Sequence, residues 1–198
     1  MNLKVFTDAT IKRRDKLTKN LEAAFGGCVI NNSGDVLFNF YDKIAQKNID
    51  IAYSNIAIIE AMAIHVAIGY AKKMKARNIA IHTDNLLCVQ MIAKGLKAQH
   101  LTKKIITNAQ VTNKCPSLLQ FVLQKPIFLK EIQAIINKLR CFRNITIFHI
   151  NRCFNKYADS LSKYSFSLFY KTTASHECLT RTLRHNLQRS LIASQHLL

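Results

Sequence analysis

The chain has 198 residues, of which 29 are Lys or Arg and 11 are Asp or Glu, so its formal net charge is +18. An apolar fraction of 49% with two prolines and five glycines excludes wholesale disorder, and the length suits one domain with an appendage. The charge favours a polyanionic partner, nucleic acid first and an anionic membrane surface second. A basic composition shared with the whole genome is the simpler alternative.

Cysteine spacing and the apolar runs exclude further classes of protein. The six cysteines form no C-x-x-C pair, which argues against structural zinc and for reduced thiols in an intracellular protein of the cytoplasm or nucleus. The N-terminus lacks the apolar core of a secretory signal. The longest apolar run, residues 56–71, contains Glu60 and His65 and is short for a membrane span. We therefore expect a buried helix there and no membrane partner.

The first third of the chain alternates short apolar runs with polar turns. The predicted strands cover residues 3–10, 24–30, 36–41 and 49–53. A polar, basic segment at 11–22 follows the first strand. Asn and Gly in the turn at 31–35 favour a hairpin, so these strands predict an antiparallel meander.

The remaining elements alternate between helix and strand. Helices are predicted at 54–74, 85–94, 128–142 and 154–166, and strands at 79–84 and 145–150, whereas 96–126 shows no clear pattern. Ser54 or Asn55 is the expected N-cap of the first helix, and Gly95 is expected to end the second. This order predicts an α/β fold with a mixed sheet of about five strands and helices on both faces.

Two of the predicted strands contain an apolar run that ends in the same dipeptide, Thr-Asp. Asp8 closes the run that contains Phe6, and Asp84 closes the run that contains His82. If the two strands are parallel neighbours, both carboxylates lie at the carboxyl edge of the sheet, where open α/β sheets place their sites.

Two more acids lie in apolar surroundings, Glu60 and Asp159, each in the second turn of a predicted helix. Taken singly, each acid fits a helix cap or a surface position. Packed together, the four carboxylates would repel one another and favour their neutral forms unless cations are present. Hard oxygen ligands suit Mg²⁺ or Mn²⁺, and a pair of such ions suits in-line attack on a phosphodiester.

The order of these motifs resembles the ribonuclease H family. The matching pieces are Phe6-Thr7-Asp8, Glu60 on the helix after the strands, Thr83-Asp84-Asn85, and His149, Arg152 and Asn155 before Ala158-Asp159-Ser160-Leu161. The last piece is most similar to the retrotransposon and plant branch. The resemblance covers residues 1–168 as a ribonuclease H-like domain. The tail at 169–198 lies outside it, and its leucines at a spacing of four predict a basic helix.

The resemblance implies an endonuclease that hydrolyses the RNA strand of RNA/DNA hybrids with two Mg²⁺ or Mn²⁺ ions. Asp8, Glu60, Asp84 and Asp159 would be the metal ligands and, with His149, the catalytic residues. Substrate-binding residues would be Thr10, Arg13, Arg14, Asn55, Asn85, Arg152 and Asn155. His149 would assist water activation or product departure. His65 and His82 are expected to be structural.

Other readings of the same motifs remain open. Proofreading-type exonucleases usually carry a second acid two residues after the first, where this chain has Thr10, and transposase-like relatives place their Glu later than Glu60. A junction resolvase keeps a similar order of acids. A ribonuclease H-like module that binds nucleic acid without cutting it is the alternative from another class.

Overall fold

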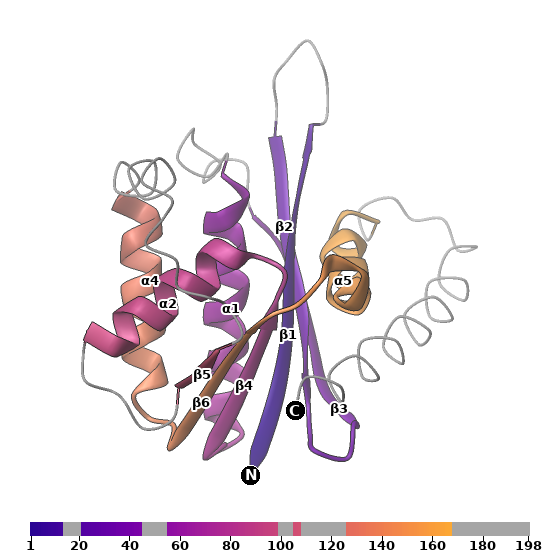
Figure 1. Cartoon of the computed structure of the whole chain (residues 1–198). Coiled ribbons are helices and arrows are strands. Elements are labelled where there is room, and N and C mark those ends of the chain that lie inside the picture. The colour runs from indigo at the N-terminus through magenta and orange to yellow at the C-terminus, as the bar shows by residue number, and fades with distance from the viewer. Residues whose placement is uncertain (14–20, 45–54, 99–104, 108–125, 168–198) are drawn as a thin grey trace.

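The computed structural model describes residues 1–13, 21–44, 55–98, 105–107 and 126–167 and places helices on both faces of a mixed sheet (Figure 1). The strands are β1 (Asn2–Arg13), β2 (Leu21–Ile30), β3 (Val36–Ile44), β4 (Asn78–Thr83), β5 (Ile105–Thr107) and β6 (Asn144–His149), in the spatial order β3-β2-β1-β4-β6-β5. The predicted mixed sheet is confirmed. Its three-residue edge strand β5 comes from the stretch for which the sequence predicted no element.

Strand β1 joins the two halves of the sheet. It pairs with β2 in antiparallel fashion as far as Arg13, but its parallel pairing with β4 ends at Thr7 opposite Thr83. The prediction that this strand ends at Thr10 is therefore wrong, because the antiparallel hairpin extends it. Asp8 is the first residue of β1 beyond the parallel pairing, which places its side chain where β1 and β4 part.

In the described part of the chain, the helices are α1 (Ile56–Lys73), α2 (Leu86–Ala98), α4 (Pro126–Leu139) and α5 (Lys156–Ser167), with the 3-10 turn η3 (Arg152–Phe154) before α5. Helices α1, α2 and α4 cover one face of the sheet, and α5 covers the other (Figure 1). Helix α1 is buried along most of its length and forms the centre of the larger core with residues such as Val5 and Ile81. Under α5, Phe6, Phe148 and Leu161 form a smaller core.

Two helix boundaries differ from the prediction for a packing reason. Helix α2 runs through Gly95 to Ala98, because this glycine is a contact point for α4 rather than a helix stop. A Cβ atom there would lie 2.1 Å from Cδ1 of Ile136. The last predicted helix is divided at Asn155, which caps η3 before α5 begins.

Several predictions lie outside the described residues: the strand at 49–53, Arg14 and the helical tail at 169–198. None of the described helices is long and apolar enough to cross a membrane. Of the described cysteines, Cys28 and Cys88 are buried thiols as expected, whereas Cys141 and Cys153 are exposed.

Candidate active site

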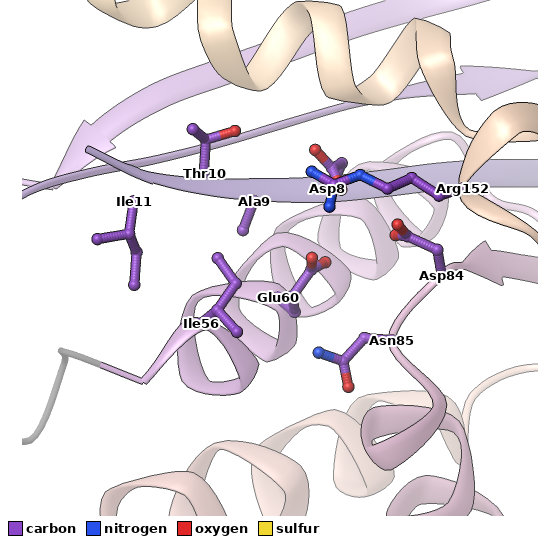
Figure 2. Close-up of a pocket in the computed structure, with 9 residues that line it drawn as sticks. All are labelled: Asp8, Ala9, Thr10, Ile11, Ile56, Glu60, Asp84, Asn85 and Arg152. Carbon is purple, nitrogen blue, oxygen red and sulfur yellow. The ribbon is translucent and has the colours of Figure 1, made fainter.

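A cleft of about 380 Å³ opens where β1 and β4 part (Figure 2). It is lined by Asp8, Ala9, Thr10, Ile11, Ile56, Glu60, Asp84, Asn85 and Arg152. These residues come from β1, the first turns of α1, the loop after β4 and the turn η3. The lining combines three carboxylates with one guanidinium.

Three predicted acids converge in this cleft from three different elements. Asp8 and Glu60 are 2% and 4% exposed, and Asp84 is half-buried. Each offers a carboxylate oxygen, and the three oxygens lie within 4.8 Å of one another. The expectation that Asp8 and Asp84 share one edge of the sheet is therefore confirmed. Figure 2 shows Glu60, on α1, lying below β1 beside Asp84.

Burial and mutual repulsion raise the pKa of two of these acids. Burial, followed by the charges of Asp84 and Asp159, raises the pKa of Asp8 from its ordinary 3.8 to about 8, although the Ser162 hydroxyl and Arg152 oppose the shift. Burial also raises the pKa of Glu60 well above its usual range, with Asp8 and Asp84 adding to the effect. A cation bound among these acids would favour their charged forms and so oppose both shifts.

The donor set fits a hard divalent cation. Glu60 has a buried oxygen, Oε2, with no hydrogen-bond partner among the described residues, and leaving a buried carboxylate oxygen unpaired is costly. Carboxylate oxygens are the ligands that Mg²⁺ and Mn²⁺ prefer, and Mg²⁺ commonly uses one or two of them together with substrate phosphates. The geometry therefore offers a site in which an ion would satisfy Asp8, Glu60 and Asp84 together.

Asp159 lies beside this group rather than within it. It is in the first turn of α5, where Lys163 donates to its Oδ2 at 2.6 Å and Arg152 Nη2 lies 3.8 Å from its Oδ1. That Oδ1 atom is buried and accepts no hydrogen bond from the described residues. Asp159 is close enough to raise the pKa of Asp8. A role as fourth metal ligand remains a prediction, and it requires the acid to exchange its cationic partners for metal.

Asn155 lies beneath the cleft. It is fully buried, and its Nδ2 donates to the backbone oxygen of Thr7 at 2.8 Å and to Asp84 Oδ1 at 3.0 Å. It thus ties the loop after β4 to β1 and fixes the direction of the Asp84 carboxylate. The sequence suggested a contact with substrate, but this position makes Asn155 a residue that orients an acid.

His149 is the last residue of β6, and it does not line the cleft. Its Nε2 donates to the backbone oxygen of Asp84 at 3.1 Å. His82, by contrast, is buried between the rings of Phe6 and Phe148, and burial lowers its pKa to about 3, so the expected structural role of His82 fits. His65 forms a pair with Glu131 and does not contact the acids of the cleft.

Ser162 is the residue of the site that the sequence reading missed. Its hydroxyl lies 3.1 Å from Asp8 Oδ2 and 2.7 Å from the hydroxyl of Thr10. Helix α5 comes this close because β2 has Gly26 at the contact, where a Cβ atom would lie 2.4 Å from the Ser162 backbone nitrogen. The sequence offered no clear signal for Ser162, because a second serine, Ser165, is buried on the same helix.

The remaining predicted binding residues that the structure describes are two helix caps and the last residue of a strand. Asn55 caps α1 by accepting from the Ala57 backbone at 2.9 Å, as predicted. Asn85 lines the cleft and accepts from the Cys88 backbone at 3.0 Å. Arg13 is the last residue of β1. For Asn55 and Asn85, capping alone accounts for the residue type, and contact with substrate remains a prediction.

The sheet order and the placement of the helices define the chain as a protein with the ribonuclease H fold. It is similar to RNase H1 from the halophilic archaeon Halobacterium salinarum NRC-1, with a TM-score of 0.58 and 16% identity over 84% of this chain and 98% of that one. It is also similar to the RNase H domain of PFV, with a TM-score of 0.58 and 19% identity over 84% and 94% of the two chains.

A third similar structure is LC11-RNase H1, a protein isolated from compost, in complex with an RNA/DNA hybrid. The TM-score is 0.54, and 14% of residues are identical over 85% of this chain and 99% of that one. No protein-family model and no curated protein matches the sequence. The ribonuclease H resemblance is thus confirmed in the fold, while the retrotransposon and plant branch stays a prediction.

Proposed function

We propose that the protein is a metal-dependent endonuclease that hydrolyses the RNA strand of RNA/DNA hybrids. The observation that carries this proposal is the convergence of three carboxylates in a cleft of a strongly basic protein. The hybrid as substrate is supported by the similar LC11-RNase H1 structure, which holds one. The net charge of +18 supports a nucleic-acid partner in general.

Asp8, Glu60 and Asp84 would hold a pair of Mg²⁺ or Mn²⁺ ions, with Asp159 as a fourth ligand. When bound, such ions activate the attacking water and stabilise the leaving oxygen of a phosphodiester. The protein's own part is to keep the carboxylates in place. Helix α1 presents Glu60, and Asn155 orients Asp84.

The cationic and polar residues of the cleft would position the substrate. Arg152 lines the cleft with a side chain that is 73% exposed, so its guanidinium is available to a phosphate oxygen. Thr10 and Asn85 line the same cleft. His149, which bonds to the Asp84 backbone, would assist water activation or product departure. Arg13 and Arg14 would contact the duplex.

Incubation of the protein with a labelled RNA/DNA hybrid tests the proposal directly. We expect internal cuts in the RNA strand with Mg²⁺ or Mn²⁺ and none with a chelator. Asp84→Asn should abolish cutting while binding persists, because the change removes a charge from the metal ligands and keeps the shape. Asp42→Asn, at an exposed carboxylate on β3, is the matched control. A wild-type protein that binds hybrid but cuts it with neither metal would refute the nuclease proposal.

One feature favours a second candidate, a module that binds nucleic acid without cutting it. Lys163 and Arg152 form ion pairs with Asp159, so cationic side chains already compensate the charge of the fourth acid. The same assay separates the two candidates, since the module would bind the hybrid and leave it intact. A four-way DNA junction included as a parallel substrate tests the junction-resolvase alternative.

A further inference from the structure

The end of the sheet opposite the cleft has a regular construction. The three central parallel strands β1, β4 and β6 begin with Asn2, Asn78 and Asn144, which stand opposite one another in the sheet. Asn144 Nδ2 donates to Asn78 Oδ1 at 2.8 Å, and Asn78 donates in turn to Asn2. The amide ladder holds the three strand starts in one row, at the end marked by the N-terminus in Figure 1.

An arginine precedes two of these asparagines. Arg77 comes before β4 and Arg143 before β6, and the backbone nitrogen of Arg143 donates to the backbone oxygen of Arg77 at 2.7 Å. The backbone nitrogen of Arg77 donates to Met1 at 2.9 Å. Both arginines are exposed. The fold therefore places two exposed arginines side by side, immediately before adjacent strands.

Lysines at the ends of two helices extend this row. Lys72 and Lys73 lie in the last turn of α1, and Lys138 lies in the last turn of α4. A Cβ atom on Gly69 of α1 would lie 3.6 Å from Lys138 Nζ, so the ammonium group reaches across to α1. Partial burial, together with the charges of Lys72 and Lys73, lowers the pKa of Lys138, although Glu131 opposes the shift.

Lys75 occupies a position at which glycine is usual. Helix α1 ends in a Schellman motif, with Ala76 N bonded to Ala71 O at 3.1 Å and Lys75 N bonded to Lys72 O at 2.9 Å. Lys75 has a φ of 55°, a left-handed conformation that disfavours residues with a Cβ atom. The side chain is exposed, so nothing in the packing requires a lysine here.

We propose that this basic edge, made of Lys72, Lys73, Lys75, Arg77, Lys138 and Arg143, binds the phosphates of a second nucleic-acid duplex. Asn2 and Asp8 are six positions apart along β1, which corresponds to about 20 Å. The edge and the cleft are therefore distinct surfaces. One protein molecule would hold one duplex at the cleft and another at the edge.

The charges at the edge favour nucleic acid as the partner. Glu131, the carboxylate that acts on Lys138, is already paired with His65. Lys73 also packs over the ring of Tyr70, 5.5 Å from its centroid. Clustered lysines and exposed arginines are typical of surfaces that bind a phosphate backbone. Each cationic side chain that contacts a phosphate releases a counterion from the nucleic acid, and this release favours binding at low salt.

Bridging of two duplexes is the decisive measurement. Donor-labelled and acceptor-labelled 20-base-pair duplexes are mixed with the full-length protein in a chelator, so that no cutting occurs. We expect energy transfer that rises with protein and falls at excess protein. Arg77→Glu with Arg143→Glu should remove the transfer, weaken duplex affinity about tenfold and reduce the salt slope by about two. Arg77→Gln with Arg143→Gln, checked by thermal melting, replaces this pair if the charge reversal unfolds the protein.

Matched variants distinguish this edge from net charge alone. Lys94→Glu with Lys130→Glu makes the same charge change at exposed positions on α2 and α4 and should retain bridging. Lys75→Gly should weaken bridging although it relieves the backbone. Equal loss in both charge-reversed pairs, or bridging that survives Arg77→Glu with Arg143→Glu, would overturn the proposal.

Two further measurements separate this proposal from its rivals. Vesicles of phosphatidylcholine and phosphatidylserine test a membrane surface. If Arg77→Glu with Arg143→Glu abolishes binding to the vesicles but leaves duplex bridging unchanged, the proposal that the basic edge binds nucleic acid is wrong. Cleavage of a 12-base-pair hybrid, which occupies the cleft, should be unchanged by the edge substitutions. Bridging without any cleavage would refute the nuclease while supporting the edge.

Discussion

The raised pKa of Asp8 predicts an unusual dependence of stability on pH in the metal-free protein. The folded protein keeps a proton on Asp8 up to about pH 8, whereas the unfolded chain releases it near the ordinary value of 3.8. Between these values the unfolded state binds fewer protons, so the free energy of unfolding falls as pH rises. Asp8→Asn carries no titrating proton and should not share this loss.

The size of the effect follows from one proton. The slope is at most about 1.4 kcal/mol per pH unit for a single group, so Asp8→Asn should gain about 2.7 kcal/mol over wild type between pH 5 and pH 7. Urea unfolding in a chelator, followed by circular dichroism at each pH, measures this difference. Asp42→Asn should show no such trend. A difference between Asp8→Asn and wild type that stayed constant across the range would refute the reasoning.

Four further changes test the site and its supports. Ser162→Ala should weaken Mg²⁺ binding about tenfold by calorimetry, because a hydrogen bond to a charged acceptor is lost; an unchanged affinity would contradict this. His149→Ala should slow hybrid cleavage by about 10²–10⁴-fold in a turnover assay without abolishing it. Gly26→Ala should cost about 1–3 kcal/mol in urea unfolding, since its Cβ would meet the α5 backbone. Lys75→Gly should raise stability by about 1 kcal/mol and the melting temperature with it.

The acids of the cleft could be predicted from sequence because the signal is local. Each Thr-Asp dipeptide ends an apolar run, and parallel strands bring such ends to one edge. Glu60 stands out as an acid within a buried helix. In each case the chain itself shows an ionisable group where burial is expected, and the structure brings these groups together.

Other features depend on contacts that the sequence does not display. The length of β1 is set by its partner β2, and the course of α2 through Gly95 is set by Ile136 on α4. Ser162 looks like any helical serine until Gly26 lets α5 approach β2. A residue pattern shows which local structure a segment prefers. The ends of these elements and their contacts are instead set by residues that are distant in the sequence.

The energetics of the cleft bear on whether the protein cuts nucleic acid or only binds it. Burying Asp8 and Glu60 side by side raises the pKa of both, so these acids destabilise the folded apo protein at neutral pH. A surface that only binds phosphates gains nothing from buried carboxylates, because they lower stability at neutral pH and, wherever they are charged, repel the phosphates. A cation bound between the acids and a phosphate would attract both, so it would offset the loss of stability and the repulsion of the phosphate. The acids of the cleft therefore support the proposed metal-using nuclease over a binding module.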